Sequence, residues 1–422
     1  MMSVLFTVLY GVGLVYMLKR RFDLFTLTYL TSTVYFVPAF FGVTHDGTLP
    51  LVKYEINFWQ HLFYFYYFLL LLGFSWLFTK TNATLVKIEY RQIQNFVSAD
   101  MRILKTMSQI SGVLTPLLLL LAWGTMGQAL FATEKKVVLE NFSIFFALYE
   151  ITVLIYFFTS FICKRKFHIV ASSLLIVFDL FIGFRAVGAF ALILAFTYSL
   201  LLKPSTKNTI LFGFMLIAGY TVASLYKIIT LALKYGEAAG SFLALQNFDS
   251  VMESLFVTES FTTQEVFGKT ISSNLTLPLE YPLDIIRILL PGVNNILLGK
   301  GLGFNDYYQD KLFSHIPWGL GSNVWAEQYA IWGWAGPLVL AFTLSLLLFY
   351  LNGKIFQWYS TGQVHYFSLT LFAVAPFYFY IHRNDFLFQL NITRNFLVIW
   401  VFIYFLARYV SFDIGKYLRY KT

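Results

Sequence analysis

Long apolar runs recur along this chain from its first residues to its last thirty, and they restrict the fold more than any other feature. Hydrophobic residues make up 58% of the sequence and charged residues 12%, with a mean hydropathy of +0.68. Soluble domains carry about 25% charged residues. A backbone inside lipid must satisfy its own hydrogen bonds, and apolar runs of about 20 residues do so as spanning helices. The sequence therefore predicts an all-α polytopic membrane protein, with residues 1–422 forming a single integral membrane domain.

The apolar runs predict about eleven transmembrane helices. They cover residues 2–18, 23–42, 58–78, 109–130, 142–163, 168–184, 186–202, 209–226, 325–351, 364–382 and 394–411. Lys and Arg concentrate in alternate connections, which predicts that this side is cytoplasmic, the N-terminus periplasmic and the C-terminus cytoplasmic. The net charge of +9 then reflects topology, and no nucleic acid is expected as a partner.

Two polar segments interrupt the apolar pattern. Residues 79–107 mix basic and apolar side chains, which predicts a cytoplasmic amphipathic segment at the membrane surface. Residues 227–324 lie between the eighth and ninth predicted spans and form the one long periplasmic loop, in which we expect short helices. A bundle of spans has no structural need for such a loop, and long loops of this kind are usually functional.

Three arginines from separate segments are predicted to face the outer side. Arg185 lies in a short turn between two apolar runs, Arg287 in the long loop, and Arg383 directly after the span 364–382. Each has a structural alternative: an interfacial anchor for Arg185, a helix-surface pair with Asp284 for Arg287, and a pair with Asp385 for Arg383. Guanidinium groups bind phosphate in a bidentate manner and stay charged. Together they predict a site for a polyanionic ligand.

The segment 321–336 closes the long loop and reads Gly-Ser-Asn-Val-Trp-Ala-Glu-Gln-Tyr-Ala-Ile-Trp-Gly-Trp-Ala-Gly. It resembles the loop-to-helix signature of bacterial O-antigen polymerases, the oligosaccharide repeat-unit polymerases called Wzy. The turn at 184–186 and the segment 383–386 are similar to the arginine positions of that family. An Arg-x15-Gly pattern of some members is matched by Arg287 and Gly303, whereas position 201, which would match Arg185, is Leu.

The resemblance implies a GT-C-like glycosyltransferase in the bacterial inner membrane with a periplasmic active site. Such an enzyme would join oligosaccharide repeat units carried on undecaprenyl pyrophosphate, with a Wzz-type chain-length regulator as a partner. Two alternatives stay open. One is the O-antigen ligase or another lipid-carrier-dependent glycosyltransferase, but ligases carry His-Asn at the corresponding helix, and here Ser322 precedes Asn323. The other is a polysaccharide flippase or transporter.

Within this reading the arginines hold the donor pyrophosphate, and a carboxylate or imidazole acts as a base. The catalytic candidates are Arg185, Arg287, Arg383, His315 and Glu327. The substrate-binding candidates are Asn323, Tyr329, Asp385, Arg394 and Tyr308. Asp385 is also a candidate base. Structural alternatives are a loop contact for His315, a buried helix start for Glu327, an interfacial anchor for Arg394 and belt packing for the tyrosines. The single cysteine and the scattered outer acids predict neither metal nor cofactor.

Overall fold

In the residues that the structure describes, the chain forms helices and one two-stranded antiparallel sheet. The computed structural model describes residues 2–45, 53–82, 98–131, 137, 141, 143–182, 184–216, 218–219, 259–278, 280–282, 303–314 and 321–419. The elements from the N-terminus are α1 (Met2–Lys19), α2 (Leu24–Tyr35), α3 (Val37–Phe41), β1 (Val43–His45), β2 (Lys53–Glu55), α4 (Phe58–Thr81), α6 (Ser98–Met126) and the 3-10 helix η2 (Gly127–Phe131). They continue with α8 (Ile144–Ile162), α9 (Lys166–Phe181), α10 (Arg185–Leu202), α14 (Glu259–Ser272), α17 (Phe304–Leu312), α18 (Val324–Trp332), α19 (Ala335–Ser360), α20 (Val364–Tyr380) and α21 (Phe386–Arg419).

Six helical stretches within the described residues are long and apolar enough to cross a membrane. They are Met2–Lys19, Phe58–Thr81, Asp100–Phe131, Ile144–Ile162, Ala335–Ser360 and Phe386–Ser411. Two shorter apolar helices cover Ala186–Leu202 and Val364–Ala375. The chain is therefore a mostly helical, multi-pass membrane protein, as the apolar runs predict, and the total of eleven spans stays a prediction.

Two predicted spans are divided in the structure. Within 23–42, α2 ends before Phe36 and α3 begins with Pro38 in its first turn. The 12 residues of α2 rise by about 18 Å, which is less than the hydrocarbon thickness of a bilayer. Within 325–351, α18 ends at Trp332 and the long apolar helix is α19, so the first residues of this prediction form a separate helix.

The amphipathic segment 79–107 and the span 209–226 are described only in part. Residues 98–107 are the first turns of α6 and continue directly into its apolar part. Residues 83–97 and most of 217–258 lie outside the described residues.

The contacts divide the chain into two compact units. The first contains Met1–Val86, Pro204–Gly353 and Pro376–Ile392, and the second contains Lys87–Lys203, Lys354–Ala375 and Thr393–Thr422. In the second unit, the hydroxyls of Ser108 and Ser160 form a 2.8 Å hydrogen bond between α6 and α8. His365 Nδ1 lies 2.7 Å from Asp100 Oδ2 and joins the beginning of α20 to the beginning of α6.

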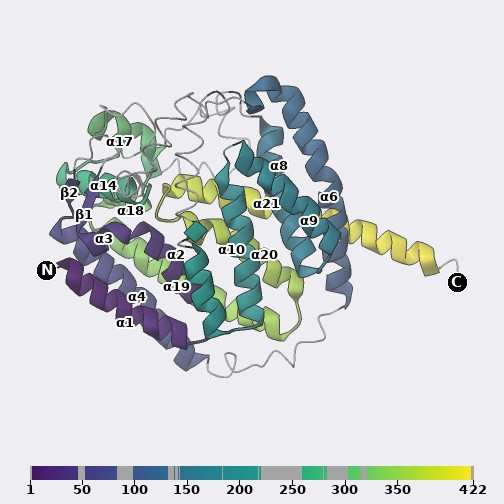
Figure 1. The fold of residues 1–422 in the computed structure, drawn as a ribbon, viewed down its shortest axis with the longest axis horizontal. Coiled ribbons are helices and arrows are strands. Elements are labelled where there is room, and N and C mark those ends of the chain that lie inside the picture. Colours follow the sequence, from purple (N-terminus) through teal and green to yellow (C-terminus); the bar gives the residue numbers. More distant parts are fainter. Residues whose placement is uncertain are drawn as a thin grey trace, which may run out of the picture. The chain divides into compact units, whose positions relative to one another are not determined.

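In the first unit, hydrogen bonds attach α14, a helix of the long polar segment, to α2 and α4. Figure 1 shows α14 beside β1, α3 and α18. The buried Ser260 hydroxyl donates to Val34 O (2.7 Å), and Gln264 Nε2 donates to Tyr35 O (3.1 Å) at the end of α2. Tyr64 of α4 donates to Gln264 Oε1 at 2.6 Å. Because these polar side chains find partners on two helices, α14 is an integral part of the unit.

The break between α18 and α19 depends on two glycines of the 321–336 motif. Gly333 has φ of 59° and ψ of −150°, a conformation that is essentially restricted to glycine. A Cβ on Gly336 would lie 2.1 Å from the backbone oxygen of Gln328, so the chain can return this closely only without a side chain. The two glycines therefore separate the short α18 from the spanning α19.

Replacing Gly333 by alanine should lower the stability of the purified protein by about 1–3 kcal/mol, because the residue would be strained at a positive φ. The thermal unfolding midpoint in detergent measures this effect. Gly73→Ala is the matched control, since it lies inside α4 with no atom within 4 Å of the added Cβ. An equal midpoint for the two variants would contradict the role of Gly333.

Candidate functional site

The candidate site lies in the first unit, where α18 meets the segment between α20 and α21. Asn323 begins α18 by accepting hydrogen bonds at Oδ1 from the backbone N–H groups of Trp325 (2.9 Å) and Ala326 (3.2 Å). Its Nδ2 donates to Thr263 O on α14 at 2.9 Å. The side chain is fully buried. This predicted substrate-binding residue therefore holds α18 on α14, which is the ordinary role of an asparagine cap.

Glu327 points from α18 toward the beginning of α21. Its carboxylate accepts a hydrogen bond from the Tyr281 hydroxyl at 2.7 Å and another from the Phe386 backbone N–H at 2.6 Å. Burial, and then the negative charge of Asp385, raise the pKa of Glu327 to about 8. The side chain has no exposed surface. Its geometry is that of a group that fixes the first turn of α21, at the helix end that favours a carboxylate.

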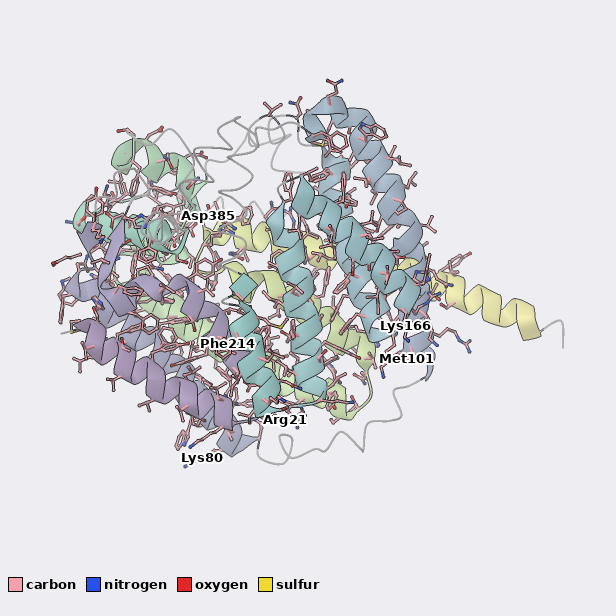
Figure 2. The ribbon with its side chains drawn as sticks, in the orientation of Figure 1. Arg21, Lys80, Met101, Lys166, Phe214 and Asp385 are labelled. Atoms are coloured by element: carbon pink, nitrogen blue, oxygen red, sulfur yellow. The ribbon has the colours of Figure 1, made fainter. Side chains whose placement is uncertain are left out.

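Asp385 caps α21 directly beside this contact. Its Oδ1 accepts the Phe388 backbone N–H at 2.7 Å. Its Oδ2 lies 3.7 Å from the position that a Cβ on Gly303 would take, which places it against the beginning of α17. Figure 2 shows Asp385 near α17, where α21 begins. Burial, followed by the charge of Asp306, raises the pKa of Asp385 to about 6, although the bond from Phe388 opposes the shift.

Arg383 and the motif that closes the long segment meet in space. A Cβ on Gly321 would lie 3.7 Å from both Cγ and the backbone oxygen of Arg383, and 3.1 Å from the Thr263 side chain. Arg383 is partly exposed, whereas Glu327 and Asp385 are buried. The Tyr308 hydroxyl of α17 donates to Gly321 O at 3.4 Å. Gly321 therefore lies close to Thr263, Tyr308 and Arg383.

The two remaining substrate-binding candidates, Tyr329 and Arg394, make hydrogen bonds to residues outside this cluster. The Tyr329 hydroxyl donates to Asn274 Oδ1 at 3.3 Å, and its ring contacts Trp334. This is a contact at the edge of α18. Arg394 belongs to the second unit, and its guanidinium donates through Nε and Nη2 to Asn395 Oδ1 at 3.1 and 2.9 Å.

Three catalytic candidates are not located by the described side chains. Arg185 is the first residue of α10 in the second unit, and its side chain is outside the description. Arg287 and His315 lie outside the described residues. Of the sequence-derived candidates, the structure brings together Arg383, Asp385, Glu327, Asn323 and Tyr308.

His382 and Tyr281 belong to the same cluster and are missing from the sequence-derived candidates. His382 accepts from the Trp325 indole and contacts Ser32 and Tyr67, and Tyr281 donates to Glu327. Tyr281 sits in a polar stretch with no motif of its own. The available signal for His382 was its position next to Arg383 at the end of an apolar run, where ionisable residues tend to be functional.

The cluster offers one guanidinium and one capped carboxyl group near the ends of α20 and α21. Such a pair can bind an anion and accept a proton. Among the residues that the structure describes, no group of three or more His, Cys, Asp or Glu side chains could hold a metal ion.

Comparisons with known proteins add no relative: no family model, no curated protein and no solved structure matches this chain.

Stability should depend on pH through Glu327, whose pKa rises on folding from an ordinary value of 4.5 to about 8. Between these values the folded state binds more protons than the unfolded state, so stability falls as pH rises. The contribution is complete below pH 4.5 and is lost as pH passes about 8. Unfolding midpoints from pH 5 to 8.5 should therefore fall less steeply in Glu327→Gln, which carries no charge.

Glutamine can keep both contacts if the Tyr281 hydroxyl accepts instead of donating. Glu327→Ala cannot, and should destabilise the protein by about 1–3 kcal/mol because the Phe386 N–H is left unpaired. Parallel pH profiles for the wild type and Glu327→Gln would show that Glu327 does not ionise in this range.

Proposed function

We propose that this chain is an O-antigen polymerase of the Wzy kind, which joins undecaprenyl-pyrophosphate-linked oligosaccharide units by glycosyl transfer. The observation that carries the proposal is the meeting of Gly321 and Arg383. The two motifs that resemble the family are separated by about fifty residues, yet they form one cluster. A site that combines an arginine with a carboxyl group suits a leaving pyrophosphate and an attacking hydroxyl.

In this mechanism Arg383 binds the donor pyrophosphate, with Arg185 and Arg287 as further proposed ligands. The acceptor hydroxyl oxygen forms a bond to the anomeric carbon of the donor sugar. The bond between that carbon and the phosphate oxygen breaks, and its electron pair leaves with the pyrophosphate. The charge on the departing group is then offset by guanidinium groups, which can contribute about 3–4 kcal/mol each when preorganised. The acceptor proton goes to a base.

The local geometry favours Asp385 over Glu327 as that base. Both oxygens of Glu327 accept hydrogen bonds inside the fold, so it serves better as a positioning residue. Asp385, with its pKa raised to about 6, is mostly ionised at neutral pH and still basic enough to take a proton. His315 stays a further candidate from the sequence.

The proposal includes a location and a partner. The alternation of basic connections supports an outward N-terminus and a cytoplasmic C-terminus. The resemblance implies that the membrane is the bacterial inner membrane and that the N-terminus and the site are periplasmic. The resemblance supports a GT-C-like arrangement and a Wzz-type regulator. A ligase would share the donor chemistry but would use lipid A-core as its acceptor.

Replacing Arg383 by alanine should abolish the ladder of repeat units on a lipopolysaccharide gel and leave a band with one attached unit. Arg383→Lys should restore little, because lysine cannot bind phosphate in a bidentate manner. Arg102→Ala, at an exposed position on α6, is the matched control and should give a normal ladder. Membrane expression of each variant is checked by immunoblotting.

The gel and a leaflet measurement together separate the alternatives. A normal ladder from Arg383→Ala would refute the arginine site. Loss of all attached antigen in a deletion strain would indicate a ligase or a flippase. Accumulation of repeat units on the cytoplasmic leaflet, measured separately from the gel, would indicate the flippase.

A further inference from the structure

His382 is held by three helices at the start of the segment that carries Arg383. The Trp325 indole Nε1–H of α18 donates to His382 Nδ1 at 2.9 Å. His382 Nε2 lies 2.8 Å from the Ser32 hydroxyl of α2 and 3.4 Å from the Tyr67 hydroxyl of α4. The imidazole is fully buried. Both ring nitrogens therefore have partners inside the fold.

These contacts determine the protonation state of the ring. An indole N–H can only donate, so His382 Nδ1 must carry a lone pair. In the neutral ring the proton then resides on Nε2, which donates to the Ser32 hydroxyl. A second proton on Nδ1 would face the Trp325 N–H, so the contacts favour the neutral ring. His382 therefore serves as a neutral hydrogen-bonding group inside the fold, and no acid or base role is assigned to it.

Helix α18 holds the segment 382–386 at both ends. Trp325 binds His382 at the first residue, and Glu327 binds the Phe386 N–H at the last. Arg383, Asn384 and Asp385 lie between these attachments. The two attachment points, His382 and Phe386, are four residues apart, and both are bound by side chains of α18. These contacts restrict the backbone that carries Arg383.

We infer that His382 is a positioning residue that sets the direction of the Arg383 guanidinium toward an anionic ligand. The inference rests on the proposed function, because it gives Arg383 a pyrophosphate to bind. A contribution to stability alone would leave the affinity for that anion unchanged in every variant that folds. The role is therefore tested by whether the effect of His382 depends on Arg383.

The test is a double-mutant cycle with inorganic pyrophosphate as the probe. Full-length protein in detergent is titrated by calorimetry for the wild type, His382→Phe, Arg383→Ala and the double variant. His382→Phe should weaken binding about tenfold or more, since a charge-assisted contact becomes misaligned. The double variant should bind no more weakly than Arg383→Ala, because both substitutions remove the same interaction.

Two further variants keep the test decisive if His382→Phe does not fold. His382→Asn can present an oxygen to the Trp325 N–H and an amide to Ser32, so it should bind within a few fold of the wild type. Trp325→Phe removes the donor together with part of a buried ring, and it should weaken binding in an Arg383-dependent way. Folding is checked by size exclusion and by the unfolding midpoint.

The outcomes separate the two proposals. The positioning role would be overturned if the losses of pyrophosphate affinity in His382→Phe and Arg383→Ala multiplied in the double variant. It would also be overturned if folded His382→Phe bound pyrophosphate with full affinity. Either result would leave the proposed function intact. A wild type that binds no pyrophosphate, or an Arg383→Ala variant that binds it normally, would overturn the pyrophosphate site and this inference together.

Discussion

The double attachment of segment 382–386 to α18 is the interaction on which the rest of the candidate site depends. Trp325 and Glu327 are two residues apart on one helix, and they bind the two ends of the segment. The Trp325–His382 contact is buried and the Glu327–Phe386 contact is partly buried, so loss of a partner in either would leave an unsatisfied polar group at a cost of up to about 1–3 kcal/mol. The same contacts that stabilise the connection between α20 and α21 therefore also direct Arg383 and Asp385. The same two hydrogen bonds therefore serve both the stability of this connection and the proposed catalytic arrangement.

Helix α18 can act as this anchor because it is short and fixed at both ends. Asn323 caps its beginning and ties it to α14, while Gly333 ends it before the spanning α19 starts. Without the break at Gly333, α18 and α19 would form one continuous helix. Backbone conformation thus accounts for the presence of Gly333 and Gly336 in the motif. The hydrogen bond to the Phe386 N–H accounts for the presence of Glu327.

The apolar runs predicted the helical membrane fold because hydropathy and length are local properties of the sequence. The breaks at Phe36 and Gly333 were not predicted, since apolar side chains continue through both. Arg383 was predicted from its position after a predicted span and Asp385 as its neighbour, whereas Glu327 was predicted from the segment that resembles the polymerase signature. The contacts of Tyr281 and His382 were not predicted, because they join residues that are 46 and 57 positions apart in the sequence. The position of His382 beside Arg383 was the local signal for that residue, and Tyr281 had none.

Reconstitution of the purified chain tests the central claim most directly. Proteoliposomes containing the protein would be given lipid-linked oligosaccharide units extracted from the membranes of the source cells, and the products would be resolved by mass spectrometry. Chains of two or more repeat units, with one undecaprenyl pyrophosphate released for each new linkage, are the result that the proposed function predicts. Unchanged single units, or units moved across the bilayer with no new bond, would contradict it.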